Sequence, residues 1–272
     1  MSILYTGKNQ RIFGTFPLNG GDVRDAVNAA VEVGYRAFDT AQMYGNEADV
    51  GAALADCGIA RSALCVTTKV HPDRFSEDLF LPSVEQSVRD LGGDPVDLLL
   101  LHWPTVGGDI VPSLKRLQAA HDRGLARNVG VSNYTIDQMK TAASVLEIPI
   151  ATNQVEFHPL IDQAKFLEAA SKLGVPLSAY CSIARGKVFD YPELAEIAAA
   201  HGKSVPQVSI KWLLQKGVCP ITMSTKPKNI QANFDVMDFT LSNVDMKLID
   251  QLASRVHHRL TASVPWAPVW DS

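Results

Sequence analysis

The feature that most constrains the fold of this chain is a repeated alternation of short apolar runs with longer amphipathic stretches. The run from Val96 to His102 is apolar at nearly every position, as expected of a strand that is covered on both faces. Between such runs, apolar residues recur three or four positions apart, which is the helical period. The expected strands are Arg36–Thr40, Leu64–Lys69, Val96–His102, Asn128–Ser132, Ala151–Glu156, Leu177–Cys181, Cys219–Ser224 and Asp235–Phe239.

About eight strands in alternation with helices predict a closed parallel (β/α)8 TIM barrel, which is an α/β fold. An open doubly wound sheet is the alternative, but the sequence lacks the G-x-G-x-x-G turn that usually follows its first strand. We therefore expect residues 1–272 to form a single domain. Glycine is expected to end several helices in a left-handed cap, at Gly34, Gly124, Gly174 and Gly217. The expected helices are Val23–Val33, Glu47–Asp56, Leu81–Leu91, Val111–Arg123, Ile136–Leu146, Gln163–Leu173 and Val205–Lys216.

Composition excludes several classes of protein. Hydrophobic residues make up 46% of the chain, charged residues 20%, and the net charge is −4, which is typical of a globular protein without a nucleic-acid surface. The N-terminus lacks the charged-then-apolar order of a signal peptide, and no apolar run approaches the roughly 20 residues of a membrane span. We expect a cytoplasmic protein with no nucleic-acid or membrane partner. The oligomeric state cannot be read from the sequence, and a monomer is the default expectation.

The cysteines and histidines do not predict a metal site. No pair of cysteines has the close spacing of a zinc knuckle or a redox motif. Cys65 and Cys219 lie inside strand-like runs, so we expect them to be buried free thiols. The histidines at His71, His158, His257 and His258 share no ligand spacing either.

Ionisable side chains stand at the ends of successive predicted strands. Asp39, Lys69 and His102 each end one, and Tyr44 follows five residues after Asp39. In a parallel barrel these ends meet at one rim, where active sites are found. A phenol is a weak acid at neutral pH, and a cation against its oxygen lowers the phenol pKa. The pattern predicts Tyr44 as general acid, activated by Lys69, with Asp39 holding Lys69 and His102 aligning a substrate oxygen.

The motifs that carry these residues resemble those of the aldo-keto reductase superfamily along almost the whole chain. Within it, the chain looks most like the bacterial branch that includes 2,5-diketo-gluconate reductases. The resemblance implies the same four catalytic residues and an NADP(H) cofactor bound across the barrel mouth. It is carried by Gly34–Ala41, Tyr44–Glu47, Lys69, Leu98–Pro104, Gly130–Asn133, Asn153–Glu156, Ile230 and Asn233.

The resemblance also implies how the cofactor and the substrate are held. Ser132, Asn133 and Gln154 match residues that bind the nicotinamide carboxamide, and Tyr180 matches the residue that stacks on the ring. Phe16, Trp103 and Trp266 are expected to line the substrate pocket beside Tyr44 and His102. The rest of the cofactor is expected to contact Ser182, Ile183, Ser224, Thr225, Lys226 and Asn233.

One part of the cofactor site departs from the family pattern. Met223 and Asn229 stand where the family usually carries the Lys and Arg that bind the 2′-phosphate of NADPH. A charge-assisted contact to a phosphate contributes roughly 1.5–3 kcal/mol, so their loss predicts a reduced NADPH preference, with NAD(H) or dual use open. Lys226 and Lys228 could substitute from new positions, or could belong to a solvated turn.

The leading hypothesis is an NAD(P)H-dependent enzyme that reduces a small aldehyde, ketone or keto-sugar to the alcohol. Two alternatives remain open at this point. Lys69 could be the Schiff-base lysine of an aldolase, although an adjacent Asp39 would keep it charged and non-nucleophilic. The chain could also be a cofactor-binding regulatory subunit of the same fold, although the complete set of four catalytic residues argues against this.

Overall fold

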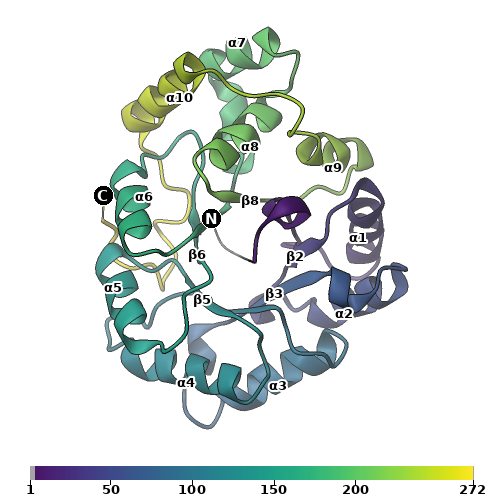
Figure 1. Ribbon diagram of the computed structural model, residues 1–272, viewed down its shortest axis with the longest axis vertical. Coiled ribbons are helices and arrows are strands. Elements are labelled where there is room, and N and C mark those ends of the chain that lie inside the picture. Colours follow the sequence, from purple (N-terminus) through teal and green to yellow (C-terminus); the bar gives the residue numbers. More distant parts are fainter. Residues whose placement is uncertain (1–3, 272) are drawn as a thin grey trace.

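The computed structural model describes residues 4–271, which form a closed barrel of parallel strands inside a ring of helices (Figure 1). Each strand is bonded to its neighbours in chain order, and the first and last strands close the ring. The predicted (β/α)8 fold is therefore confirmed. The strands are β1 (Ile12–Gly14), β2 (Ala37–Asp39), β3 (Cys65–Val70), β4 (Leu98–Leu101), β5 (Val129–Ser132), β6 (Asn153–Glu156), β7 (Leu177–Tyr180) and β8 (Cys219–Thr222).

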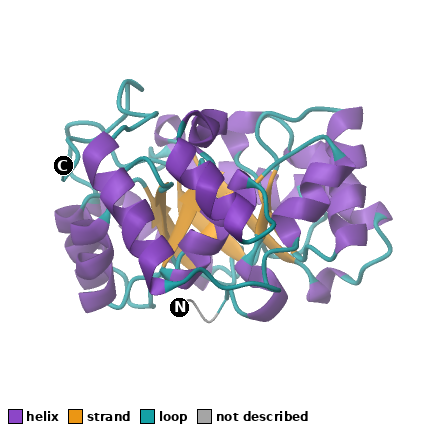
Figure 2. Cartoon of the chain, turned by 90° about the horizontal axis from the view of Figure 1, so that it is seen from above, coloured by secondary structure: helices purple, strands orange, loops and turns teal. Residues whose placement is uncertain are grey.

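Helices cover the outer face of the barrel, as Figure 2 shows from the side. They are α1 (Gly21–Val33), α2 (Glu47–Asp56), α3 (Phe80–Asp90), α4 (Val111–Asp122), α5 (Ile136–Val145), α6 (Ala164–Lys172), α7 (Pro192–Ala200), α8 (Val205–Gln215), α9 (Pro227–Phe234) and α10 (Asn243–Val256). Short 3-10 helices lie in the connections: η1 (Gly7–Gln10), η2 (Gln42–Tyr44), η3 (Arg61–Ala63), η4 (Pro72–Arg74) and η5 (Ala184–Asp190).

One expected strand is wrong and one strand was not expected. Residues Asp235–Phe239 form no strand but connect α9 to α10, on the outside of the barrel. Their alternating pattern arises because Val236 is buried beneath this connection while Met237 is 53% exposed. The missing strand is β1, near the N-terminus, which is too short for a periodic pattern and pairs with both β2 and β8.

The strands face two different cores. Leu99 and Leu101 of β4 point outward into the large core between the strands and the helices. Leu98 and Leu100 point into the barrel, where they join Tyr5 from the N-terminal segment. Burial on both faces explains why β4 reads as a continuous apolar run.

Tyr5 fills the barrel from the end opposite the polar strand ends. Its side chain is fully buried, and its hydroxyl lies 3.1 Å from Thr67 Oγ1 inside the barrel. In Figure 1 this N-terminal segment lies across the middle of the ring, whereas the C-terminal segment runs beside α5 and α6. The two ends of the chain therefore serve different parts of the barrel.

Two glycines are required by the geometry. Gly34 ends α1 with φ of 118°, and its N–H is bonded to the carbonyl oxygens of Ala30 and Val31, as expected of a left-handed cap. A Cβ on Gly130 in β5 would lie 2.6 Å from the Thr152 carbonyl oxygen and 2.8 Å from a Leu100 methyl. Any larger residue at position 130 would push neighbouring strands apart.

The cysteines are free thiols, and Cys65 and Cys219 are buried as predicted. Burial raises the pKa of Cys219 to about 12, so this thiol stays protonated and unreactive. Among the helices of residues 4–271, none combines the length and the apolar character that crossing a membrane requires.

Candidate active site

The structure brings the predicted catalytic residues to one rim of the barrel. Asp39 ends β2, Lys69 lies near the end of β3, and His102 follows β4 directly. Because the strands are parallel and adjacent, their C-terminal ends meet at the same rim. Tyr44 reaches this rim from η2, a single turn that begins three residues after Asp39.

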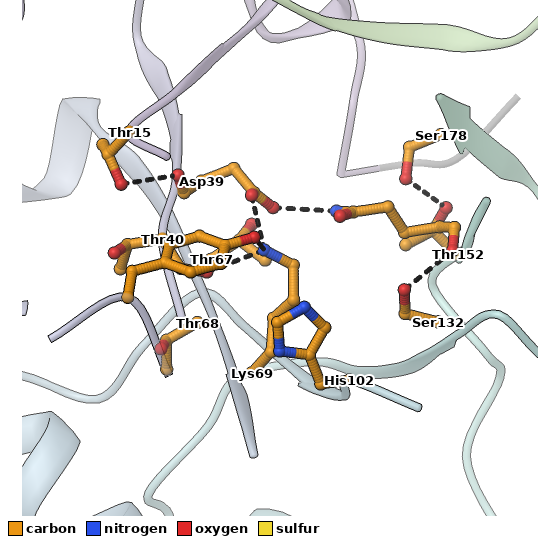
Figure 3. A network of polar contacts seen from close by, with 12 residues as sticks. Thr15, Asp39, Thr40, Thr67, Thr68, Lys69, His102, Ser132, Thr152 and Ser178 are labelled. Atoms are coloured by element: carbon orange, nitrogen blue, oxygen red, sulfur yellow. Dashed lines mark hydrogen bonds and ion pairs between the residues drawn. The ribbon is translucent and has the colours of Figure 1, made fainter. Parts of the chain in front are cut away.

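Lys69 is the centre of the site. Its ammonium is fully buried and donates to Asp39 Oδ1 at 2.5 Å, to the Thr40 carbonyl oxygen at 2.8 Å and to the Tyr44 hydroxyl at 3.3 Å. These bonds use all three of its donors. Figure 3 shows the side chain of Lys69 pointing toward Asp39. The other Asp39 oxygen accepts a bond from Gln154 Nε2 at 2.8 Å, so both sides of the carboxylate are occupied.

Burial and charge set the protonation states of this cluster. Burial alone would lower the pKa of Lys69, but Asp39 and Tyr44 outweigh it and raise that pKa, so the ammonium persists. Burial raises the pKa of Tyr44, and Lys69 opposes this rise without cancelling it. The predicted lowering effect of Lys69 on this pKa is therefore present, but burial outweighs it and the net shift is upward. Tyr44 is held as a neutral phenol with a proton to give.

His102 is held as a neutral imidazole. Burial, followed by the nearby charges of Lys69 and His71, lowers the pKa of His102 well below 6.5. Its ring lies 5.7 Å from the Tyr44 ring, edge to face. Asn133 Nδ2 donates to the His102 carbonyl oxygen at 3.0 Å and fixes the backbone there. A neutral ring beside the Tyr44 hydroxyl can share a hydrogen bond with the same substrate oxygen.

The residues expected to hold the carboxamide form one hydrogen-bonded network. Ser132 Oγ donates to the Gln154 carbonyl oxygen at 2.8 Å, and Asn133 Nδ2 donates to Ser132 Oγ at 3.0 Å. Tyr180 donates its hydroxyl to Asn133 Oδ1 at 2.7 Å. All four side chains are therefore brought together, next to Asp39 through Gln154.

The two loops expected at the far end of the cofactor are arranged differently from each other. After β7, Ser182 Oγ lies 2.9 Å from two carbonyl oxygens, those of Ala179 and Ile221. Its hydroxyl therefore links β7 to β8 and has no proton left to donate to a ligand. Ile183 beside it is half-buried and packs against the core.

The loop between β8 and α9 is polar and largely open. Ser224 Oγ accepts the N–H of Lys226 at 3.1 Å, and Thr225 and Lys226 are exposed. Asn233 is buried on α9. Met223, by contrast, is half-buried against the core, so no charge stands at that position.

Aromatic side chains surround the catalytic cluster on the substrate side. Phe16 is 54% exposed and its ring lies 5.0 Å from the Tyr44 ring. Trp103 is buried, and the rings of Trp266 and Trp270 lie 6.4 and 6.3 Å from it. The C-terminal segment therefore reaches the predicted pocket.

Two residues of this region were given no role from the sequence. Glu156, fully buried at the end of β6, accepts bonds from the N–H groups of Leu260 and Thr261 and from Thr261 Oγ1, at 2.6, 2.9 and 2.6 Å. Thr261 Oγ1 also lies 3.0 Å from the Tyr180 hydroxyl. His71 lies beside His102. His71 directly follows β3, two residues after Lys69, and this spacing was a signal that could have placed it there.

No metal centre is evident in the part of the chain that the structure describes. Residues 4–271 contain no group of three or more His, Cys, Asp or Glu side chains that could hold an ion. A cavity of about 510 Å3 lies away from the catalytic cluster, between α6 and the C-terminal segment, and is lined by Phe166, Arg259 and Trp270 among others. It includes none of the four predicted catalytic residues.

Comparison with known proteins identifies relatives of nearly full length. Residues 12–254 match the aldo/keto reductase family. Methylglyoxal reductase DkgB of Yersinia pestis is 39% identical over 261 residues, which cover 95% of this chain and 97% of that protein. The uncharacterized oxidoreductase YtbE of Bacillus subtilis is 37% identical over 237 residues, or 86% of this chain and 84% of that protein.

Solved structures give the same result. The crystal structure of a putative 2,5-diketo-D-gluconic acid reductase B matches with a TM-score of 0.93 and 39% identity, covering 100% of this chain and 97% of that one. The aldose reductase of Schistosoma japonicum matches with a TM-score of 0.88 and 28% identity, covering 96% of this chain and 94% of that one.

Proposed function

Because this chain belongs to the aldo/keto reductase family and is an NAD(P)H-dependent carbonyl reductase, we propose that Asp39, Tyr44, Lys69 and His102 carry out its reaction. One observation carries the assignment: the buried Lys69 ammonium lies 2.5 Å from Asp39 and 3.3 Å from the Tyr44 hydroxyl. A cation in that place supports a phenol that must lose its proton during reduction.

Each residue then has a separate task. Tyr44 donates its hydroxyl proton to the carbonyl oxygen, and the resulting phenolate is stabilised by Lys69. Asp39 keeps Lys69 charged and in place. The neutral His102 hydrogen-bonds the same oxygen and orients it. When bound, the nicotinamide supplies the hydride that reaches the carbonyl carbon.

The polar network at the rim suits the carboxamide of this cofactor. A carboxamide needs both donors and acceptors, and Ser132, Asn133 and Gln154 offer both within one connected group. The half-buried ring of Tyr180, anchored through its hydroxyl, is suited to a flat face-to-face contact. We assign the carboxamide to these three residues and the ring to Tyr180.

Replacing Tyr44 by Phe tests the catalytic assignment. The ring and its contact with Phe16 remain, whereas the donor is lost, so reduction should fall by about 10²–10⁴-fold. Cofactor binding, followed by fluorescence titration, should change little. Retained turnover in Tyr44→Phe would refute the acid role. If the chain were instead a non-catalytic cofactor-binding subunit, the natural chain itself would bind the cofactor without reducing a carbonyl substrate.

The far end of the cofactor is assigned to Ser182, Ile183, Ser224, Thr225, Lys226 and Asn233, and we propose that the enzyme uses both NADH and NADPH. Met223 packs against the core and Asn229 is uncharged, which leaves Lys226 in the loop and Lys228 in the first turn of α9 as the exposed cations there. Both lysines are exposed, and a single ammonium on a long flexible side chain holds a phosphate less firmly than a fixed pair of cations does.

Titrating both cofactors by fluorescence tests this preference. The proposal expects dissociation constants within about a hundredfold of each other, because the two missing charge-assisted contacts would together supply a discrimination of about 10²–10⁴-fold. The double variant Met223→Lys, Asn229→Arg should tighten NADPH selectively, and NADH is the internal control. NADPH binding more than a hundredfold tighter to the natural chain would reject dual use.

The substrate is a small aldehyde, ketone or keto-sugar. The relatives named above are described as reductases of methylglyoxal and of 2,5-diketo-gluconic acid, both small carbonyl compounds. We assign the pocket to Phe16, Trp103 and Trp266, beside Tyr44 and His102. The Phe16 ring lies against the Tyr44 ring, and the rings of Trp103 and Trp266 lie against each other. A panel of aldehydes, ketones and keto-sugars with both cofactors tests the range.

An aldolase using Lys69 is the second candidate, and the geometry argues against it. A Schiff-base lysine must be an uncharged amine, whereas Asp39 raises the pKa of Lys69. Borohydride in the presence of a carbonyl substrate would trap a Schiff base on Lys69, and we expect no such adduct.

The setting of the enzyme is part of the same proposal. Residues 1–272 act as one domain, the protein is a monomer, and it works in the cytoplasm, where free thiols such as Cys65 persist. Size-exclusion chromatography with light scattering tests the monomer, and cell fractionation tests the compartment.

A further inference from the structure

Thr261 is a buried residue of the C-terminal segment that the proposed mechanism does not use. It lies in a turn after α10 and is 7% exposed. Its hydroxyl oxygen lies 2.6 Å from Glu156 Oε2 and 3.0 Å from the Tyr180 hydroxyl. One hydroxyl group therefore joins a buried carboxylate of β6 to the aromatic ring that is assigned to the nicotinamide.

Glu156 fixes the place of Thr261 and the direction of its hydrogen bond. Burial would raise the pKa of Glu156, but the bonds donated by His158, Leu260 and Thr261 outweigh it and lower that pKa, so the carboxylate is charged. A carboxylate can only accept hydrogen bonds. The Thr261 hydroxyl therefore donates to Glu156 Oε2, and the Thr261 backbone N–H donates to the same oxygen at 2.9 Å.

The direction of this bond determines what Thr261 can do for Tyr180. Because its own proton is used by Glu156, the Thr261 oxygen can only accept from the Tyr180 hydroxyl. Asn133 Oδ1 accepts from the same hydroxyl at 2.7 Å, so the two contacts form a three-centre hydrogen bond. Burial, followed by the charge of Glu156, raises the pKa of Tyr180 well above 10, and the hydroxyl keeps the proton that both acceptors need.

We propose that Thr261 is a positioning residue for the cofactor, which holds the Tyr180 ring at the angle that a stacked nicotinamide requires. A phenol with a single partner can tilt about that contact. Acceptors from two separate parts of the chain, the end of β5 and the C-terminal segment, remove this freedom. A surface that is already ordered binds its ligand more tightly, because less ordering is left to occur on binding.

The inference rests on the proposed stacking role of Tyr180 and adds to it a residue 81 positions later in the chain. Anchoring of the C-terminal segment does not by itself require the Thr261 hydroxyl. The backbone N–H groups of Leu260 and Thr261 already bond to Glu156, at 2.6 and 2.9 Å. The hydroxyl is the part of Thr261 that reaches Tyr180, so replacing it alone separates positioning of the ring from anchoring of the segment.

The test measures the dissociation constants of NADPH and NADH by fluorescence titration. Thr261→Val keeps the shape and the backbone bonds but removes the hydroxyl, and Thr261→Ser keeps the hydroxyl. We expect Thr261→Val to raise the dissociation constants about tenfold, since one lost hydrogen bond corresponds to about a tenfold change, and Thr261→Ser to stay within about twofold of the natural chain. In a Tyr180→Phe background, where the partner hydroxyl is absent, Thr261→Val should change them by less than about twofold.

Other outcomes overturn the inference. Equal weakening by Thr261→Val in the natural and Tyr180→Phe backgrounds would indicate a structural role, and equal weakening by Thr261→Val and Thr261→Ser would show that the hydroxyl is not the group responsible. Should Thr261→Val fail to fold, as judged by its melting temperature, Thr261→Ala in the same two backgrounds replaces it. Failure of the natural chain to bind either nucleotide would reject the proposed function itself, whereas unchanged binding in Thr261→Val rejects only the positioning role.

Discussion

The ion pair between Asp39 and Lys69 gives the sharpest quantitative prediction for this protein. Lys69 is fully buried and the Asp39 side chain is 4% exposed, at a separation of 2.5 Å. Removing one partner of such a pair leaves an uncompensated buried charge and costs about 3–5 kcal/mol. In Asp39→Asn the amide oxygen still accepts from Lys69, and the Thr40 carbonyl and Tyr44 hydroxyl remain. We therefore expect a loss near the lower end, about 3 kcal/mol of the free energy of unfolding.

Substitution of Lys69, alone and together with Asp39, measures the interaction energy between the two side chains. Lys69→Met leaves the buried Asp39 carboxylate without its counter-charge and with only the bond from Gln154. We again expect the free energy of unfolding to fall by about 3–5 kcal/mol. The double variant Asp39→Asn, Lys69→Met contains no buried charge at this place. Its loss should therefore be smaller than the sum of the single losses by about 2–3 kcal/mol.

Urea unfolding followed by circular dichroism measures these differences, provided that the m-values of the variants agree. The surface pair Lys172 and Glu168 is the matched control, at 2.6 Å but with side chains 74% and 66% exposed. Lys172→Met should cost less than about 0.5 kcal/mol. Additive losses at Asp39 and Lys69, within about 0.5 kcal/mol, would refute the reasoning that burial makes this pair interdependent.

Three further results are expected. The rate of reduction should be independent of pH from about 6 to 9. The raised pKa of Tyr44 keeps its hydroxyl protonated, and the lowered pKa of His102 keeps its ring neutral. A steady-state pH profile with an ionisation near 6.5 would contradict this. Glu156→Gln removes the charged acceptor that binds the C-terminal segment, so trypsin should cleave after Arg259 at least tenfold faster. The surface variant Glu168→Gln should be cleaved at the rate of the natural chain. Gly130→Ala should lower the free energy of unfolding by about 1–3 kcal/mol through overpacking, as measured by urea unfolding. The control Gly21→Ala, where a Cβ meets nothing within 4 Å, should be neutral or slightly stabilising. Equal effects of the two substitutions would show that close packing does not determine the residue at position 130.

Much of the fold could be predicted because its signals are local. A strand buried on both faces, such as β4, is apolar at every position, and a helix such as α2 has its own period and sequence limits. The short strand β1 could not be found in this way, since its place is set by pairing with β2 and β8. The expected strand at Asp235–Phe239 shows the opposite error, in which a connection with one buried side chain imitates alternation.

In the candidate site, too, the features with a local sequence signal were predictable and those that depend on distant contacts were not. Strand ends and family motifs were sufficient to predict Asp39, Lys69 and His102, and these three do meet at one rim. Lys69 lowers the Tyr44 pKa as predicted, but the larger opposite effect of burial was not predicted, because the burial of a hydroxyl depends on residues distant in the chain. The hydrogen bonds of Glu156 could not be predicted from the sequence either, since they join residues more than a hundred positions apart.

The anchoring of the C-terminal segment has a consequence for when the enzyme becomes active during its synthesis. Glu156 bonds to Leu260 and Thr261, which lie 104 and 105 positions later, and Thr261 in turn touches the Tyr180 hydroxyl. Asp271 Oδ2 also accepts the N–H of Ile136 at 2.7 Å, 135 positions earlier. Since the ribosome delivers the chain from its N-terminus, the barrel strands are all available before the residues that complete the rim. Leu260, Thr261 and Asp271 therefore join their partners on β6, β7 and α5 only after those elements have been made, and the rim is complete only then.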